Sequence, residues 1–131
     1  MPNEISASVS LSVRNGNLQD SFSSSKRLDQ ANARSVGGVF TAAGSVVTVS
    51  LGQLATAGYA AFRSLEAQTA GTHYVAVGHY DGTNLHELFR LKPSDIAGPM
   101  RLAKGITVGA KAYTSSSYTS AQAVQYLVLE E

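Results

Sequence analysis

The chain has no cysteine and no tryptophan, and only 3 of its 131 residues are proline. Without cysteine, neither a disulfide nor a thiolate metal site can contribute to stability, and the redox state of the compartment is left open. A chain of this length buries enough apolar surface in a single core to fold without such cross-links. We therefore expect one domain over residues 1–131.

An excess of charge of either sign is also missing, because 10 Lys and Arg residues stand against 9 Asp and Glu residues and the net charge is +1. A protein whose affinity rests on neutralising phosphates carries a clear basic excess. We therefore expect no nucleic-acid partner. The chain has no stretch of about 20 apolar residues and no basic segment followed by an apolar run at its start, so we predict neither a membrane span nor an export signal.

The clearest pattern that is present runs from Ile5 to Val13, where every odd position is apolar and every even position is serine. Successive side chains of a β-strand point to opposite faces, so this period predicts a strand with one face for a core and one serine face for water or a polar partner. Asn15-Gly16 then predicts a tight turn, because such turns need positive φ. We expect residues 18–34 to form an irregular strand followed by a loop or a short helix.

The rest of the chain alternates β-branched or aromatic runs with turn residues. The stretch from 51 to 65 is compatible with a helix or a strand, and Gly58 with the alternation after it favours a strand. Asp81-Gly82 predicts a hairpin between residues 73–77 and 85–91. Proline predicts corners at 92–95 and at Gly98-Pro99. About eight short strands predict an all-β fold, an antiparallel sandwich or barrel. Further strands are expected at 46–51, 100–103, 106–113 and 123–129.

Three histidines close in sequence, His73, His79 and His86, are the obvious candidates for catalysis or metal binding. In a hairpin, His73 or His79 could lie across from His86, and with Asp81 or Glu87 they would offer nitrogen and oxygen ligands to zinc. The chain lacks HxH and HExxH spacings, and the favoured interpretation is imidazoles bonded to water or backbone. GxSxG, P-loop and GxGxxG patterns are absent as well, so we expect no enzyme, no cofactor and no metal site.

Two tyrosines, Tyr80 and Tyr118, fall in predicted loops. A rigid amphipathic ring in a loop is better explained by contact with a partner than by a core. With Asp81 and Asn84, these tyrosines are the candidate exposed loop contacts, and together they could line a shallow sugar site.

Four segments, in this order, resemble a group of small virion structural proteins of tailed bacteriophages. A glycine-tyrosine strand ending in an Arg-polar-Leu-acid sequence precedes a strand ending in Val-Gly, and a strand ending in Phe-Arg-Leu-Lys-Pro follows. The segments cover about half of the chain and carry packing and turn motifs. They are NEISASVSLSVRNGNL (Asn3–Leu18), LGQLATAGYAAFRSLE (Leu51–Glu66), HYVAVGHYDGTNLHELFRLKPSD (His73–Asp95) and AVQYLVLEE (Ala123–Glu131).

The resemblance implies a jelly-roll β-sandwich that assembles on a phage particle as a capsid decoration or cement protein, often as a trimer. Its partners would be the major capsid protein or other virion proteins, and it would be made in the host cytoplasm and located in the virion. A near-neutral charge, a polar strand face and no recognisable reactive site agree with a subunit that acts through buried contact area. The alternative is a carbohydrate-binding or receptor-binding module of a tail or baseplate.

The expected assembly contacts are in the N-terminal part of the chain. The N-terminal segment Met1–Val13, with its strand at residues 4–13, or the polar stretch Phe22–Ser35 would lie against the capsid shell or a neighbouring subunit and add main-chain hydrogen bonds to a sheet edge. The candidate residues are Ser8, Ser10, Phe22, Arg27 and Arg34.

Overall fold

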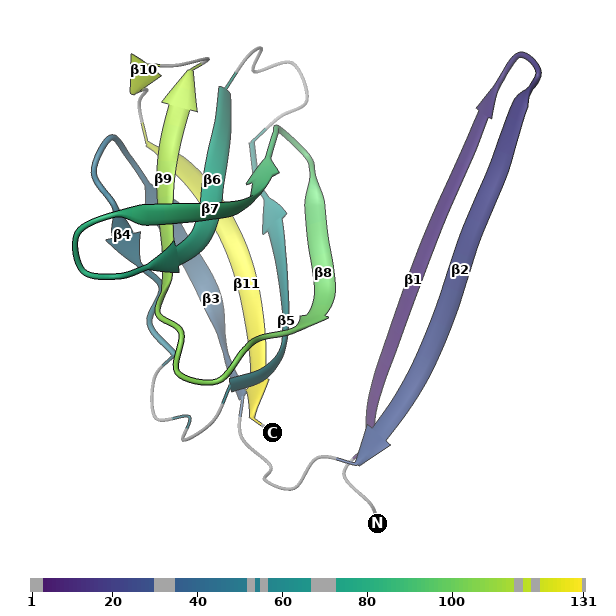
Figure 1. Ribbon diagram of the computed structural model, residues 1–131, viewed down its shortest axis with the longest axis horizontal. Coiled ribbons are helices and arrows are strands. Elements are labelled where there is room, and N and C mark those ends of the chain that lie inside the picture. The colour runs from purple at the N-terminus through teal and green to yellow at the C-terminus, as the bar shows by residue number, and fades with distance from the viewer. Residues whose placement is uncertain are drawn as a thin grey trace.

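The computed structural model describes residues 4–29, 35–51, 54, 57–66, 73–114, 117–118 and 121–130. The protein is all-β, and its strands form three antiparallel sheets. Two sheets make a sandwich, and the third is a two-stranded arm (Figure 1). The expected fold class is confirmed. No helix in the part of the chain that the structure describes is long and apolar enough to cross a membrane.

The two sandwich sheets have the strand orders β3-β11-β5-β8 and β10-β9-β6-β7, and β4 also pairs with β9. Without β10, the order of the second sheet is β4-β9-β6-β7. When the eight sandwich strands are numbered 1 to 8 along the chain, the two sheet orders are 1-8-3-6 and 2-7-4-5. They are the two sheets of a jelly roll, which is built from two Greek keys. The strands are β3 (Ser35–Ala42), β4 (Val47–Thr48), β5 (Ala57–Ser64), β6 (His73–Tyr80), β7 (Leu85–Leu91), β8 (Ile96–Arg101), β9 (Val108–Thr114), β10 (Ser117–Tyr118) and β11 (Gln122–Glu130).

The hydrophobic core fills the space between the two sandwich sheets. Val124 and Val128 of β11 and Phe62 of β5 come from one sheet, and Val75 and Val77 of β6 come from the other. Neighbouring positions on β5 alternate between buried and more exposed side chains, as a strand with one core face requires. The prediction of a strand rather than a helix is therefore confirmed for Ala57–Ser64.

Turns follow the expected chemistry at two places and depart from it at a third. Gly16 has φ +57 and is the first of the two residues that join β1 to β2, and Ser94 at φ 66 turns the chain between β7 and β8. Gly98-Pro99 is not a corner, because it lies inside β8 as an irregularity in the pairing with β5. β8 is an edge strand. Proline has no N–H group to donate, and at the edge of a sheet no neighbouring strand needs that hydrogen bond.

The arm consists of β1 (Glu4–Asn15) and β2 (Leu18–Asp29), paired without interruption from Glu4↔Asp29 to Asn15↔Leu18. The expected irregular strand at residue 18 is regular, and the expected loop or short helix was wrong for residues 26–29, because β2 continues through them. The rest of that prediction, residues 30–34, lies outside the described part of the chain. The many polar side chains of β2 are compatible with a two-stranded ribbon, since such a ribbon has no face that a second layer must cover. Figure 1 shows the arm standing apart from the sandwich, on the side of β8.

Candidate assembly surface

The register of the arm sorts its side chains into two chemically different faces. Residues directly opposite each other on an antiparallel pair project on the same side. The even positions of β1 therefore share a face with the odd positions of β2, and this serine face comprises Ser6, Ser8, Ser10, Ser12, Ser21, Ser23 and Ser25 with Arg14, Gln19 and Arg27. The opposite face carries the apolar residues, here called the apolar arm face: Val9, Leu11, Val13, Leu18 and Phe22.

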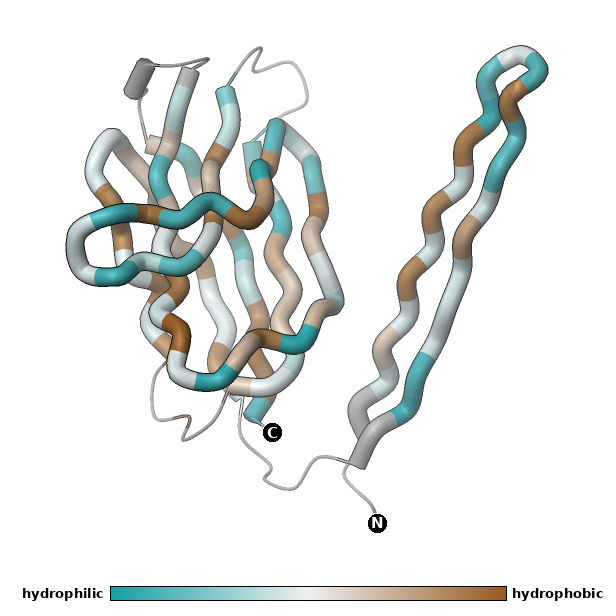
Figure 2. Tube along the Cα trace, in the orientation of Figure 1, coloured by the Kyte–Doolittle hydropathy of each residue, from teal (hydrophilic) through white to brown (hydrophobic). Residues whose placement is uncertain are grey.

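The apolar arm face is uncovered in the single chain. Leu11 is 69% exposed, Phe22 is 60% exposed and Leu18 is 58% exposed. Apolar positions alternate along β1 in Figure 2, although the arm has no second layer. For the described side chains, the prediction that the odd positions of this strand face a core was wrong, because the described core consists of residues of the sandwich and its connections. The side chain of Ile5 lies outside the described part of the structure. Contiguous exposed apolar side chains on a soluble protein mark an interaction site.

The predicted assembly contacts divide between the two faces. Ser8, Ser10 and Arg27 share the serine face, whereas Phe22 lies opposite Leu11 on the apolar arm face. Arg34 lies outside the described residues. The candidates therefore belong to two chemically different surfaces.

Near its base, the arm approaches the outer face of the β3-β11-β5-β8 sheet. Ser6, Ala7 and Ser8 line a cleft of about 280 Å³ together with sheet residues that include Ala61 and Leu127. The five residues of the apolar arm face are not among those that line it. The arm therefore meets its own sheet with its base, and its apolar residues lie beyond this contact.

The outer face of this sheet is itself partly apolar. One row across all four strands consists of Val39, Gln125, Arg63 and Ile96, which are successive cross-strand partners. In the next row, Leu127 lies between Gly37 and Ala61. Val39, Ile96 and Leu127 are exposed, and we call these three residues with Ala61 the outer patch.

Two polar contacts cross the outer face beside the outer patch. The Arg63 Nε–H donates to Gln125 Oε1 at 2.5 Å, within the first row. The Arg101 guanidinium lies over the Tyr59 ring, 4.9 Å from its centroid. A groove of about 350 Å³ also opens on this face, and Ala61, Ile96, Pro99 and Leu127 are among the residues that line it. Basic and apolar groups therefore share this surface.

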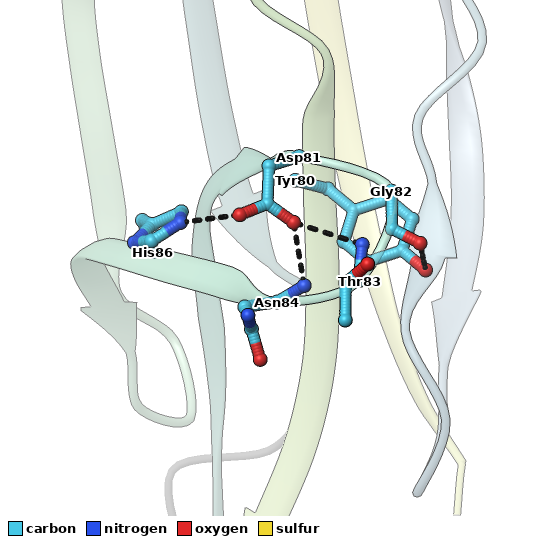
Figure 3. Close-up of polar contacts among 6 residues, drawn as sticks. All are labelled: Tyr80, Asp81, Gly82, Thr83, Asn84 and His86. Atoms are coloured by element: carbon cyan, nitrogen blue, oxygen red, sulfur yellow. Dashed lines mark hydrogen bonds and ion pairs between the residues drawn. The ribbon is translucent and has the colours of Figure 1, made fainter.

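The other predicted contacts lie at the β6–β7 hairpin (Figure 3). Tyr80 is the last residue of β6 rather than a loop residue, and its hydroxyl donates to the Gly82 carbonyl at 3.0 Å. Asp81 Oδ1 accepts from the Thr83 and Asn84 N–H groups at 2.8 and 2.7 Å, and Oδ2 lies 2.8 Å from His86 Nε2. These side chains therefore serve the turn itself. The side chain of Tyr118 lies outside the described part of the structure.

These contacts to Asp81 determine its ionisation. The backbone hydrogen bond from Asn84 is the largest influence, followed by His86 and the Thr83 N–H, and together they hold the pKa of the Asp81 carboxyl far below its ordinary value of 3.8. Each of them favours the charged form of the carboxyl. Asp81 therefore stays ionised and fixes the geometry of the turn at neutral pH.

The histidines are only partly brought together. His79 and His86 are direct cross-strand partners, and their rings stack with centroids 6.1 Å apart. His73 lies at the other end of β6, opposite Thr114. Among the residues that the structure describes, no three His, Cys, Asp or Glu side chains form a group that could hold a metal ion.

Sequence reasoning missed Val9, Leu11, Val13 and Leu18 as surface residues. The available signal was the pairing that Asn15-Gly16 imposes. A two-residue turn there places serines opposite serines on one face and leaves Lys26, Ser24 and Asp20 among the apolar residues of the other face. A face so diluted with polar groups is unsuited to a core.

Comparison with known proteins gives no further guide. No protein-family model matches the chain, and no curated protein and no solved structure is significantly similar to it. The assembly surface therefore has to be interpreted from its own chemistry.

Proposed function

We propose that this protein is a non-enzymatic structural subunit of a bacteriophage virion, a capsid decoration or cement protein that binds the major capsid protein or another virion protein as a homo-oligomer, with a trimer favoured. The observation that carries the proposal is the arm, a ribbon of two 12-residue strands that stands off a jelly roll. The resemblance of four segments to phage virion proteins supports the phage setting.

The physical argument starts from the stability of the arm. An isolated two-stranded hairpin is at best marginally stable in water, and independent stability needs a third strand or a packed face. The arm has neither within its own chain beyond the contact at its base. A long ribbon of this kind is therefore expected to become fully ordered when partners cover it.

The serine face is the surface that we assign to the capsid. Ser8, Ser10 and Arg27 on this face offer hydroxyl and guanidinium groups without an apolar patch. Small hydroxyl side chains let another backbone approach closely. They replace hydrogen bonds to water by hydrogen bonds to the partner, with little loss of side-chain rotamer entropy. A polar contact of this kind suits a protein that is added to a finished shell.

Binding to particles tests the proposal. Purified protein is mixed with virions that lack it, the particles are sedimented, and the bound copies are counted and located by electron microscopy. We expect saturation at a stoichiometry that matches capsid lattice points. Ser8→Lys with Ser10→Lys is expected to leave the protein folded and weaken this binding at least tenfold. Density at the tail would contradict decoration and favour the tail or baseplate alternative, and no binding would refute both roles.

A further inference from the structure

Two uncovered apolar surfaces lie on the same chain, one on the arm and one on the sandwich. We propose that the apolar arm face of one copy packs on the outer patch of a second copy, so that neighbouring copies are joined by their arms. The inference rests on the proposed role as an assembly subunit and specifies the contact between copies. The contact between copies can be tested without a phage particle. The contact can therefore be refuted while binding to the capsid is confirmed, and binding to the capsid can be refuted while the contact is confirmed.

The shapes and side chains of the two surfaces are compatible. Both are faces of pleated sheets, and such faces pack about 10 Å apart with interdigitating side chains. Phe22 and Leu11 stand directly opposite each other on the arm, and they are its two most exposed apolar side chains. The groove beside Ile96 and Leu127, which Ser8 of the chain's own arm also lines, is the hollow on the outer sheet that we assign to the aromatic ring.

The charged groups at the margins of the two surfaces are complementary. Arg63 lies in the first row of the outer face, between Gln125 and Ile96. On the arm, Asp20 lies opposite Val13 and is two positions from Phe22, so it projects on the apolar arm face. Its carboxylate supplies the charge opposite to Arg63 when Phe22 enters the groove. Lys26, the basic residue on the same arm face, lies towards the base, opposite Ala7.

A ring of copies reaches the area of a standard interface only through both of the contacts that each copy makes. Two strands of 12 residues, at about 3.3 Å per residue and about 4.8 Å between strands, give one ribbon face of roughly 400 Å². In a ring, each copy gives its arm to one neighbour and receives the arm of another, so each contact covers roughly 400 Å² per partner, about half the area per partner of a standard interface, and the two contacts together cover about 800 Å² of every copy.

A second copy covers more of the exposed surface than any other single occupant. In one chain the arm meets its own sheet through Ser6, Ala7 and Ser8, and both apolar surfaces remain exposed. A partner of another kind would cover one surface and leave the other in water. An arm-to-sheet contact joins two different patches, and repetition of such a contact gives a ring, such as a trimer, when the rotation between neighbouring copies closes.

Photo-cross-linking of the full chain tests the contact. p-Benzoylphenylalanine replaces Phe22 in unlabelled protein, which is refolded together with an excess of 15N-labelled natural protein and irradiated. Mass spectrometry of the joined peptides then shows which residue is contacted and whether it belongs to the labelled copy. The same amino acid at Ser23, on the opposite face of the arm, is the matched control.

The proposal predicts that the Phe22 variant joins to labelled peptides of β3, β5, β8 or β11, and that the Ser23 variant does so at least fivefold less. Leu127→Lys in the labelled protein should abolish this product. Cross-links confined to unlabelled peptides would show an arm that folds back on its own sheet, and cross-links to another arm or to the β6-β9 sheet would show a different contact. Either result, or the absence of joined peptides, would overturn the proposal.

Discussion

Gly78 is a residue of β6 that has no room for a side chain beside the backbone of β7. A Cβ atom there would lie 1.9 Å from the His86 carbonyl oxygen and 2.9 Å from the Leu88 nitrogen, and both are backbone atoms. The pairing shifts at this point, because Val77 is opposite Phe89 and Gly78 is opposite Glu87, which leaves Leu88 as the extra residue of a bulge. The bulge therefore depends on glycine at this position.

Gly78→Ala should lower the free energy of unfolding by about 3 kcal/mol or more, because the clash is with backbone that has to move. The matched control is Gly38→Ala on β3, where nothing lies within 4 Å of the added Cβ. We expect the control to change stability by less than about 1 kcal/mol. Urea denaturation of both variants measures the difference, and equal effects would contradict this description of the bulge.

The Asp81 carboxylate should make stability depend on pH in the acid range. Its pKa is held below the ordinary value in the folded protein, so its contribution is fully present above the unfolded pKa of about 3.9 and is lost as pH falls towards the folded value. Asp81→Asn keeps an oxygen that can accept the Thr83 and Asn84 N–H groups but removes the charge. The melting temperature of the variant should therefore be lower at pH 7, and the deficit should shrink below about pH 4.

Thermal denaturation of both proteins across this pH range measures that deficit. A deficit that stays constant down to strongly acid pH would contradict the role assigned to the Asp81 charge.

Among the elements, the arm is the one whose order should depend on association. A two-stranded ribbon with both faces in water opens readily, because few apolar contacts oppose the gain in chain entropy. Amide hydrogen exchange of β1 and β2 should therefore be slow in the assembled protein. In a variant with Leu11→Lys and Phe22→Lys, amide exchange of β1 and β2 should be at least tenfold faster, while the amides of β6 and β11 keep their protection. Unchanged protection of the arm in that variant would contradict a partner-dependent arm.

At the scale of elements, the sequence predicted strands better than it predicted what covers them. The alternation from Ile5 to Val13 identified β1, Asn15-Gly16 located its turn, and the alternation after Gly58 identified β5. β2 was predicted only as an irregular strand at its start, and its continuation to Asp29 was missed, because its serines and charged residues have low intrinsic preference for a strand and are held there by pairing with β1. Gly98-Pro99 was misplaced, because only the sheet order shows that β8 is an edge.

For the whole molecule, the sandwich is expected to fold without the arm. The core contains residues from the two sandwich sheets and their connections, and none from β1 or β2. A protein that lacks residues 1–29 should therefore melt within roughly 4 °C of the Leu11→Lys, Phe22→Lys variant. A change of about 1 kcal/mol in the free energy of unfolding causes a shift of this size in such a domain. Circular dichroism with thermal denaturation measures this, and an unfolded product would contradict an independent sandwich.

The assembly surface could be predicted only in part, because exposure is a property of the whole fold. Alternation showed that β1 has two different faces, and Phe22, Ser8 and Ser10 were identified as candidate contacts. The pattern could not show that both faces are uncovered, since an apolar strand face predicts burial whether the second layer comes from the same chain or from another copy. The outer patch was missed for a related reason, because cross-strand pairing brings Val39, Ile96 and Leu127 together from three separate segments.

The most direct test of the central claim, that the apolar arm face is an assembly surface, is the mass of the protein in solution by sedimentation equilibrium. The natural protein should have a multiple of the single-chain mass, and Leu11→Lys with Phe22→Lys should reduce it to one chain. Ser10→Lys with Ser23→Lys places the same charges on the opposite face and should keep the natural mass. A natural protein that is monomeric at all concentrations, or an apolar-face variant that keeps its assembly, would contradict the claim.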